Sequence, residues 1–328
     1  MAADPDEPDA AFLDQPTSAS SQAARQEHSR RSRRCAIGYA ASGLAACSQG
    51  IAPIEETDRS SQAEIGMTWR CREAQDGLVD VDAFIGDGYV VIRGAFGADT
   101  AAGCRAVIWD ALARQGIRVD DPATWPPLVE FEGLAGGPFT AAGTSPALVG
   151  ACDELIGSGR WTSPVECGGA VVVRFPSEDR ANAGYHIEGS YDGPGGYWVN
   201  VHSKARGLLA LLLFSDVGPD DAPTRLMRGS HLVVPQFLAP HGEAGACADA
   251  VFWRPSALCL PVAHATGKAG DIYLCHPFIV HTATWPHRGS GPRMIAQPAV
   301  HVQDGFAIDG SDPSPVARAI VAGLATAD

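Results

Sequence analysis

The sequence predicts a mainly β protein with flanking helices, built around a double-sheet jelly roll. Beyond residue 170, short runs rich in β-branched and aromatic residues alternate with turns that contain Gly and Pro. Segment 208–214 (LLALLLF) is apolar at every position, as in a strand that is buried on both faces. The clearest helical patterns lie earlier, between residues 99 and 156. Many short strands behind a helical region are typical of two sheets packed face to face.

The first elements follow from local signals. Residues 82–84 lead into segment 88–92 (GYVVI), a short apolar run bounded by Gly, which predicts a first strand. Asp99 or Thr100 can cap a helix whose apolar residues recur with a period near 3.6, and Gly116 stands where that helix should stop.

Residues 120–144 contain several prolines and paired glycines and predict a loop. A second helix is expected to begin after Ser145, because Ser is a good N-cap residue and Pro146 fits the first helical position. It should run to about Ile156. The strands expected after it are 170–175, 197–202, 208–214, 270–274, one beginning at 281, and 294–302, with a turn at 229–231.

Composition narrows the class of protein. With 328 residues, 45% of them hydrophobic, the chain can bury one large core or two smaller ones. A net charge of −14 argues against nucleic acid and anionic membranes as partners, because their phosphates would be repelled. The nine Cys form no CxxC pair, which indicates reduced thiols in a cytosolic protein. There is no apolar run long enough for a membrane span.

Residues 1–66 are rich in Ala, Ser and charged residues, and are interpreted as a disordered tail ahead of a 67–328 domain. A basic patch (30–34), a weakly apolar run and a small-residue site ending at Cys47 together resemble an export signal. The long segment before the patch and the polar residues within the run argue against export. A solvated tail, or a true start at Met67, is the favoured interpretation, and the expected location is cytoplasmic.

The motif that carries chemistry is His186-x-Glu188, read together with His281. Side chains two apart on an extended segment point to the same side. A second His from a distant strand would complete three ligands on one face of a metal and leave the opposite face open. This is the two-His, one-carboxylate arrangement of non-haem Fe(II) oxygenases.

The ordered set of His186-x-Glu188, the turn RGSH (228–231), the run AGDIYLCHPFIVHTA (269–283) and PRMI (292–295) resembles the phytanoyl-CoA dioxygenase-like family of Fe(II)/2-oxoglutarate-dependent oxygenases. The resemblance covers about residues 78–305. It implies a double-stranded β-helix, cupin-like core, with His186, Glu188 and His281 holding Fe(II). It implies 2-oxoglutarate and O2 as co-substrates, and Arg293 as the group that grips the distal carboxylate of 2-oxoglutarate.

Glu188 departs from the Asp that the family usually has, and its extra methylene moves the carboxylate outward. Carboxylate ligation stays possible, because Glu and Asp oxygens bind divalent metals alike. Halogenating relatives lack this carboxylate, so Glu188 argues for hydroxylation, desaturation or a related oxidation. Asp192 is a weaker alternative ligand with the right parity but the wrong distance.

Other residues have both a functional and a purely structural interpretation. Arg174 could reach the co-substrate or the substrate, or join a framework ion pair. His276 and His287 flank His281 and could be mistaken for it, and His231 is better explained as a residue that ties down a turn. The glycine-rich segment 193–196 is interpreted as a loop beside the site, a possible lid. Aromatic and polar candidates for the wall of a substrate pocket are Tyr185, Trp198, Asn200 and Trp285.

The sequence therefore predicts an enzyme that oxidises, most simply hydroxylates, a small natural-product or amino-acid-like molecule with release of succinate and CO2. One rival is a cupin-like metal protein, an isomerase or hydrolase, that keeps the His and Glu ligands and has no need of Arg293. The other is a non-catalytic binding protein in which Glu188 marks a decayed site.

Overall fold

The computed structural model describes residues 79–179, 184–248 and 258–326. Its largest sheet has seven antiparallel strands in the order β1-β10-β6-β12-β3-β2, with β13 also paired to β6. These strands are β1 (Tyr89–Ile92), β10 (Ile272–Cys275), β6 (Arg206–Leu213), β12 (Arg293–Ala296), β3 (Val171–Arg174), β2 (Leu128–Phe131) and β13 (Ala299–His301).

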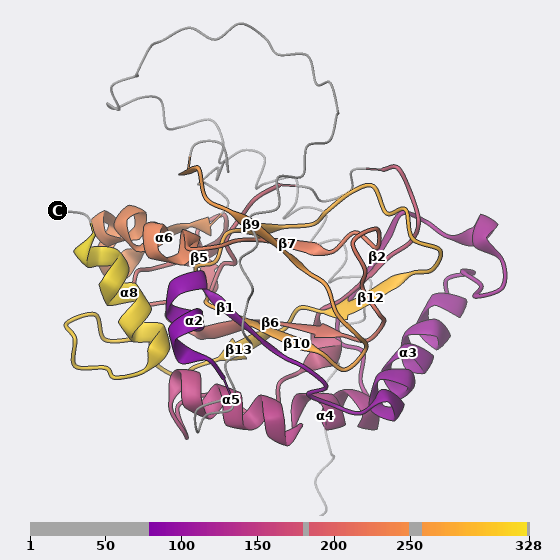
Figure 1. The fold of residues 1–328 in the computed structure, drawn as a ribbon, viewed down its shortest axis with the longest axis horizontal. Helices are drawn as coiled ribbons and strands as arrows, with labels where there is room; N and C mark the ends of the chain where they lie inside the picture. Colours follow the sequence, from indigo (N-terminus) through magenta and orange to yellow (C-terminus); the bar gives the residue numbers. More distant parts are fainter. Residues whose placement is uncertain (1–78, 180–183, 249–257, 327–328) are drawn as a thin grey trace, which may run out of the picture.

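Two smaller antiparallel sheets complete the β structure. One has the order β11-β7-β9 and the other β4-β5-β8. Their bounds are β11 (His281–Thr282), β7 (Thr224–Met227), β9 (Val262–Ala265), β4 (Tyr191–Gly193), β5 (Gly196–Val199) and β8 (Ala246–Cys247). The sheet of β7 and β9 faces the large sheet across the interior (Figure 1). This is the mainly β, jelly-roll architecture with flanking helices that the sequence predicts.

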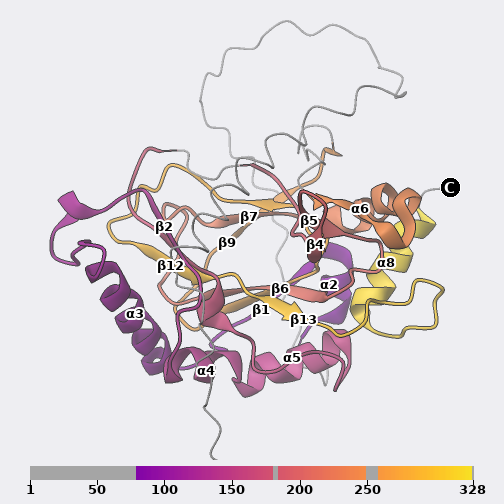
Figure 2. The ribbon, with the colours of Figure 1, turned by 180° about the vertical axis from the view of Figure 1, so that it is seen from behind.

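The helices lie outside the sheets. Figure 2 shows α3, α4 and α5 following one another in a row along the outside of the large sheet, while α6 and α8 lie together at one end. The helices are α2 (Val81–Asp87), α3 (Ala98–Ala113), α4 (Gly137–Gly143), α5 (Pro146–Ile156), α6 (Ser230–Leu238) and α8 (Pro315–Ala325), with short 3-10 turns at η1 (Pro122–Thr124), η2 (Cys167–Gly169) and η3 (Ala239–Ala244).

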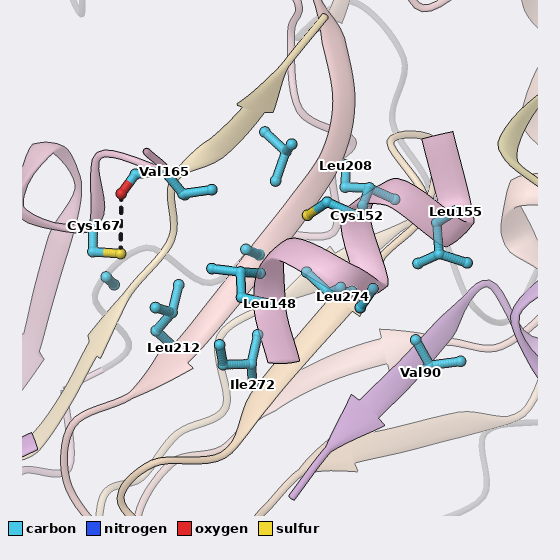
Figure 3. Packing of buried hydrophobic residues seen from close by; sticks show 14 of the residues in the cluster. Val90, Leu148, Cys152, Leu155, Val165, Cys167, Leu208, Leu212, Ile272 and Leu274 are labelled. Atoms are coloured by element: carbon cyan, nitrogen blue, oxygen red, sulfur yellow. Dashed lines mark hydrogen bonds between the residues drawn. The ribbon is translucent and has the colours of Figure 1, made fainter. Parts of the chain in front are cut away.

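The central strand β6 separates two apolar clusters. Leu208 and Leu212 point toward the helices and pack with Leu148 and Leu155 of α5 (Figure 3). Leu209, Leu211 and Leu213 alternate to the other face, where they join the smaller cluster between the sheets. Each buried Leu contributes about 1.5–3 kcal/mol through removal of apolar surface from water. Burial on both faces explains why this strand is apolar at every position.

Several expected elements are confirmed. Strand β1 and the buried strand β6 lie where the sequence predicts them. Helix α3 is also present, but the predicted cap was wrong: Gly97 is the N-cap and makes no side-chain hydrogen bond, while Asp99 and Thr100 lie inside the first turn. Helix α5 begins after Ser145, whose hydroxyl accepts a hydrogen bond from the Leu148 N–H at 3.4 Å. These elements share strong local signals, namely caps and uninterrupted apolar patterns.

Other expectations were wrong. Segment 120–144 is more than a loop, because it contains η1, β2 and α4. Strand β2 exists through pairing with β3, with Leu128 opposite Arg174, a partner that local patterns cannot reveal. The turn at 229–231 is the start of helix α6, preceded by Gly229 with a φ of 77°. The run 294–302 is two strands, β12 and β13, and α2 and α8 were not predicted.

The tail interpretation of residues 1–66, the export-like segment and Met67 lie outside the described residues. Among the described residues, no helix is both long and apolar enough to cross a membrane. The cytoplasmic location stays a prediction.

Candidate metal centre

His186 and His281 come together through the backbone. The N–H of His186 donates to the carbonyl of His281 at 3.0 Å, and the N–H of His281 donates back to the carbonyl of His186 at 2.9 Å. Residues paired across an antiparallel bridge project to the same face, and the two imidazole centroids are 4.4 Å apart. A bridge across nearly a hundred residues of sequence therefore aligns two potential metal ligands.

Glu188 completes the group. Its Oε1 lies 3.3 Å from Nε2 of His281 and 3.8 Å from Nε2 of His186. One ligand atom from each of the three residues lies within 4.8 Å of the others, and no other group of three such side chains is this close in the part of the chain that the structure describes. Donors about 2.1 Å from a metal and at right angles to one another are about 3 Å apart, so Glu188 and His281 are close to the spacing of two ligands of a divalent ion, whereas Glu188 and His186 would draw closer on binding it.

Hydrogen bonds orient both imidazoles. Nδ1 of His186 is 2.8 Å from the carbonyl oxygen of Gly184, and Nδ1 of His281 is 3.1 Å from that of Ile279. A ring nitrogen facing a carbonyl must carry the proton, so each neutral imidazole presents the lone pair of Nε2 toward Glu188. This is the tautomer that metal binding requires.

The protonation states also suit a cation. Burial would raise the pKa of Glu188, but the hydrogen bonds and charge that His186 and His281 supply when they are protonated, together with the charge of Arg206, lower it well below its usual value. Burial and the neighbouring His186 lower the pKa of His281, although Glu188 opposes this. At neutral pH the site therefore combines an ionised carboxylate with a neutral His281 imidazole, as metal ligation needs.

Arg293 is the largest fully buried side chain of the described residues, with 2% of its surface exposed. One terminal nitrogen donates to the carbonyl of Ala222 at 2.6 Å, while its buried Nε has no hydrogen-bond partner among the described residues. Burial and the charge of Arg174, which faces it across strands β12 and β3, lower the pKa of Arg293 to about 9, although Asp221 opposes the shift. At neutral pH it is thus a buried cation whose environment is incomplete without an anion.

Alternation along the strands turns Arg293 and His281 toward the same space between the sheets. Arg293 and Ile295 are two residues apart on β12 and therefore point to the same face, and His281 is paired with Leu226 on β7. Ile295 and Leu226 belong to the one apolar cluster enclosed between the sheets. Arg293 therefore projects into the space onto which His281 also faces.

The predicted wall residues are spread over different surroundings. Tyr185 and Trp285 both lie against the guanidinium of Arg225, with ring centroids 6.0 and 4.9 Å away. Trp198 donates from its indole to the carbonyl of Pro194 at 3.1 Å. The side-chain amide of buried Asn200 donates from its nitrogen to the carbonyl of Glu243 and accepts at its oxygen from the N–H of Lys204. Their contact with a substrate stays a prediction.

The rival ligands are placed elsewhere. His276 is buried between the Val316 carbonyl and the Phe278 N–H, and His231 reaches the carbonyl of Ile85 at 2.9 Å. His287 accepts from the Gly289 N–H at 3.2 Å, and exposed Asp192 lies on β4 outside the ligand group. Segment 193–196 is the tip of the β4–β5 hairpin.

Arg206, which the sequence does not single out, is a neighbour of Glu188. Its terminal nitrogen lies 3.9 Å from Oε2 of Glu188. No motif marks it, because Arg at the start of a buried strand is usually a solvated end. Only the tertiary fold brings it to the site.

The fold and the site together define a jelly-roll protein with a candidate two-His, one-carboxylate metal centre. No protein-family model matches the chain, and no curated protein matches it. Membership of the phytanoyl-CoA dioxygenase-like family therefore stays a prediction.

Among solved structures, the chain is similar to the epimerase SnoN in complex with Fe3+, alpha ketoglutarate and nogalamycin RO, with 20% identity, a TM-score of 0.46, and coverage of 68% of this chain and 81% of SnoN. It is also similar to HygX from Streptomyces hygroscopicus with nickel and 2-oxoglutarate bound, with 16% identity, a TM-score of 0.46, and coverage of 68% of this chain and 87% of HygX. A third similar structure is EctD from S. alaskensis in its apoform, with 18% identity, a TM-score of 0.46, and coverage of 75% of this chain and 83% of EctD. Similarity at this level transfers neither ligands nor function to this chain.

Proposed function

We propose that this protein is a non-haem Fe(II)/2-oxoglutarate-dependent oxygenase that oxidises, most simply hydroxylates, a small molecule. The observation that carries the proposal is a pair of features on one interior. His186, Glu188 and His281 gather three donor atoms within 4.8 Å, and Arg293 is a buried cation without a carboxylate partner among the described residues.

Each residue has a defined task. Nε2 of His186, Nε2 of His281 and Oε1 of Glu188 would hold Fe(II), leaving the opposite face of the metal open. Arg293 would bind the distal carboxylate of 2-oxoglutarate, since a planar guanidinium suits bidentate carboxylate binding in a dry site. With Fe(II), 2-oxoglutarate and O2 bound, the metal supplies oxidative decarboxylation to succinate and CO2 and oxidation of a substrate C–H bond.

The sheets enclose the Arg293 end of the site, whereas the side chains of His186 and Glu188 are 45% and 31% exposed. Leu209, Leu211 and Leu226, each at most 1% exposed, line the same interior as the candidate site. A low-dielectric wall strengthens the attraction between Arg293 and a carboxylate. The enclosed apolar cluster therefore serves both to stabilise the fold and to keep the co-substrate end of the site dry.

Arg293 separates this proposal from a cupin-like metal protein without 2-oxoglutarate turnover. Such an isomerase or hydrolase needs the three ligands but gives no reason to bury an arginine whose Nε lacks a partner. The same residue argues against a decayed site, because an unpaired buried charge destabilises a fold that has no use for it.

The test uses the full chain with Fe(II) and 2-oxoglutarate. Anaerobic addition of both should give the weak visible charge-transfer band of the chelated co-substrate, and exposure to O2 should release succinate, even slowly without substrate. His281→Ala should abolish both signals. His276→Ala is the matched control, because its imidazole lies outside the ligand group, and it should leave them largely intact.

No band and no succinate from folded wild-type protein would rule out the oxygenase and favour the cupin-like alternative. Stimulated succinate release across a panel of natural-product and amino-acid-like molecules would then identify the substrate class.

A further inference from the structure

We propose that Arg206 is a positioning residue that holds one oxygen of Glu188, so that the other oxygen alone faces the metal. The inference rests on the proposed metal centre and assigns a device that adapts it to Glu in place of the shorter Asp.

The side chain of Arg206 is held beside Glu188 by contacts of its own. It begins strand β6, its side chain is 14% exposed, and its Nε donates to the carbonyl of Gly189 at 2.9 Å. From there its terminal nitrogen reaches within 3.9 Å of Oε2 of Glu188, an ion-pair contact rather than a hydrogen bond. The guanidinium thus contacts both the backbone after Glu188 and the carboxylate itself.

The two carboxylate oxygens have different neighbours. Oε1 lies 3.3 and 3.8 Å from the two imidazole Nε2 atoms, whereas the ion pair with Arg206 is made by Oε2. A carboxylate whose second oxygen is occupied by a cation presents a single oxygen to a metal. The arrangement therefore favours monodentate ligation by Glu188.

The chain around Glu188 is fixed at three backbone points. His186 is bridged to His281, the Gly189 carbonyl accepts from Arg206, and the Ser190 N–H donates to the Trp198 carbonyl at 2.7 Å. Gly189 lets this segment approach β5, because a Cβ there would lie 2.3 Å from Cβ of Tyr197. The backbone is thus held on both sides of Glu188, whose side chain has one more rotatable bond than that of Asp. The charge of Arg206 favours the rotamer in which Oε2 faces the guanidinium.

The experiment measures Ni(II) affinity of the full-length protein by isothermal titration calorimetry, with His281→Ala as the background for other sites. Ni(II) is used because it binds imidazole sites more tightly than Fe(II) and is not oxidised in air. Arg206→Gln should weaken the site about 10–100-fold, the usual effect of losing a group that orients a ligand. Arg206→Lys, which keeps the charge, should restore part of the loss.

The matched control is Arg228→Gln. Arg228 forms an ion pair with Asp87 at 2.8 Å and is not part of the ligand group, so this substitution should leave the Ni(II) affinity unchanged. The decisive comparison is made in a Glu188→Ala background, where Arg206→Gln should have no further effect. A purely structural role through Gly189 would weaken the two-imidazole site in both backgrounds. If Arg206→Gln fails to fold, the same comparison is made with Arg206→Lys.

Unchanged affinity in folded Arg206→Gln, or an equal loss with and without Glu188, would overturn the inference and leave the proposed oxygenase standing. Absence of His281-dependent Ni(II) binding in the wild type would overturn the metal centre itself, and the inference with it.

Discussion

Replacing Arg293 by Met should make the protein without bound ligands more stable while abolishing its response to 2-oxoglutarate. The guanidinium is 2% exposed and its pKa is lowered to about 9, so at neutral pH it carries its full charge in a poorly solvated place. Burial and the neighbouring Arg174 both disfavour the charge of Arg293. Replacing buried charges by apolar side chains of similar volume typically gains about 1–4 kcal/mol, and a gain in that range is expected.

The same substitution removes the anchor for the co-substrate. Losing one partner of a buried ion pair costs about 2–5 kcal/mol of binding, or about 30- to 5,000-fold in affinity. The assay is urea unfolding of the metal-free protein, and of the protein with Ni(II) present, with and without saturating 2-oxoglutarate. The wild type should gain stability on ligand addition by mass action, and Arg293→Met should gain almost none.

The control is Arg228→Met, whose partly exposed ion pair with Asp87 should be worth at most about 1 kcal/mol, and whose response to 2-oxoglutarate should be that of the wild type. Two results would refute the reasoning. Destabilisation of the ligand-free protein by Arg293→Met would mean that the cation is already compensated, and a preserved response to 2-oxoglutarate would mean that the co-substrate binds elsewhere.

Three further predictions concern stability. Burial lowers the pKa of His231 from 6.5 to about 4, so the unfolded chain binds more protons between these values and stability falls as pH falls. In urea unfolding, this residue should lower the free energy of unfolding by about 2 kcal/mol between pH 7 and 5. The prediction is contradicted if the free energy of unfolding of His231→Gln falls with pH as steeply as that of the wild type. Leu212→Ala should cost about 2–5 kcal/mol, against under about 0.5 for exposed Val119→Ala, and equal effects would refute the packing. Gly270→Ala should lower the melting temperature strongly, because φ is +103° and a Cβ would lie 2.4 Å from a backbone oxygen, whereas Gly86→Ala has open space and should be tolerated.

Local signals predicted the elements that depend on them. Ser145 and Pro146 specify the start of α5 whatever surrounds it, and the apolar run 208–214 specifies a strand buried on both faces. Strand β2 could not be predicted in this way, because its four residues become a strand through hydrogen bonds to β3. The start of α6 was missed because Gly229 and Ser230 are equally good turn residues.

The grouping of the candidate ligands could be predicted in part for the same reason. The i, i+2 spacing of His186 and Glu188 indicates a shared face, and the ordered motif around His281 suggested its distant partner. Nothing in the local sequence marks Arg206, which reaches Glu188 only because β6 begins beside that segment. Nor could the sequence tell that Arg174 and Arg293 face each other across two strands.

By itself, then, the sequence determined the residue types available for metal chemistry, the alternation that turns them to one side, and the strands that bury an apolar core. The tertiary structure alone decided that His186 and His281 form a bridge, that Arg293 is enclosed between the sheets, and that one oxygen of Glu188 meets Arg206. The physical reason is that side-chain direction is a local property of the backbone, whereas burial and ion pairing depend on which distant strands pack together.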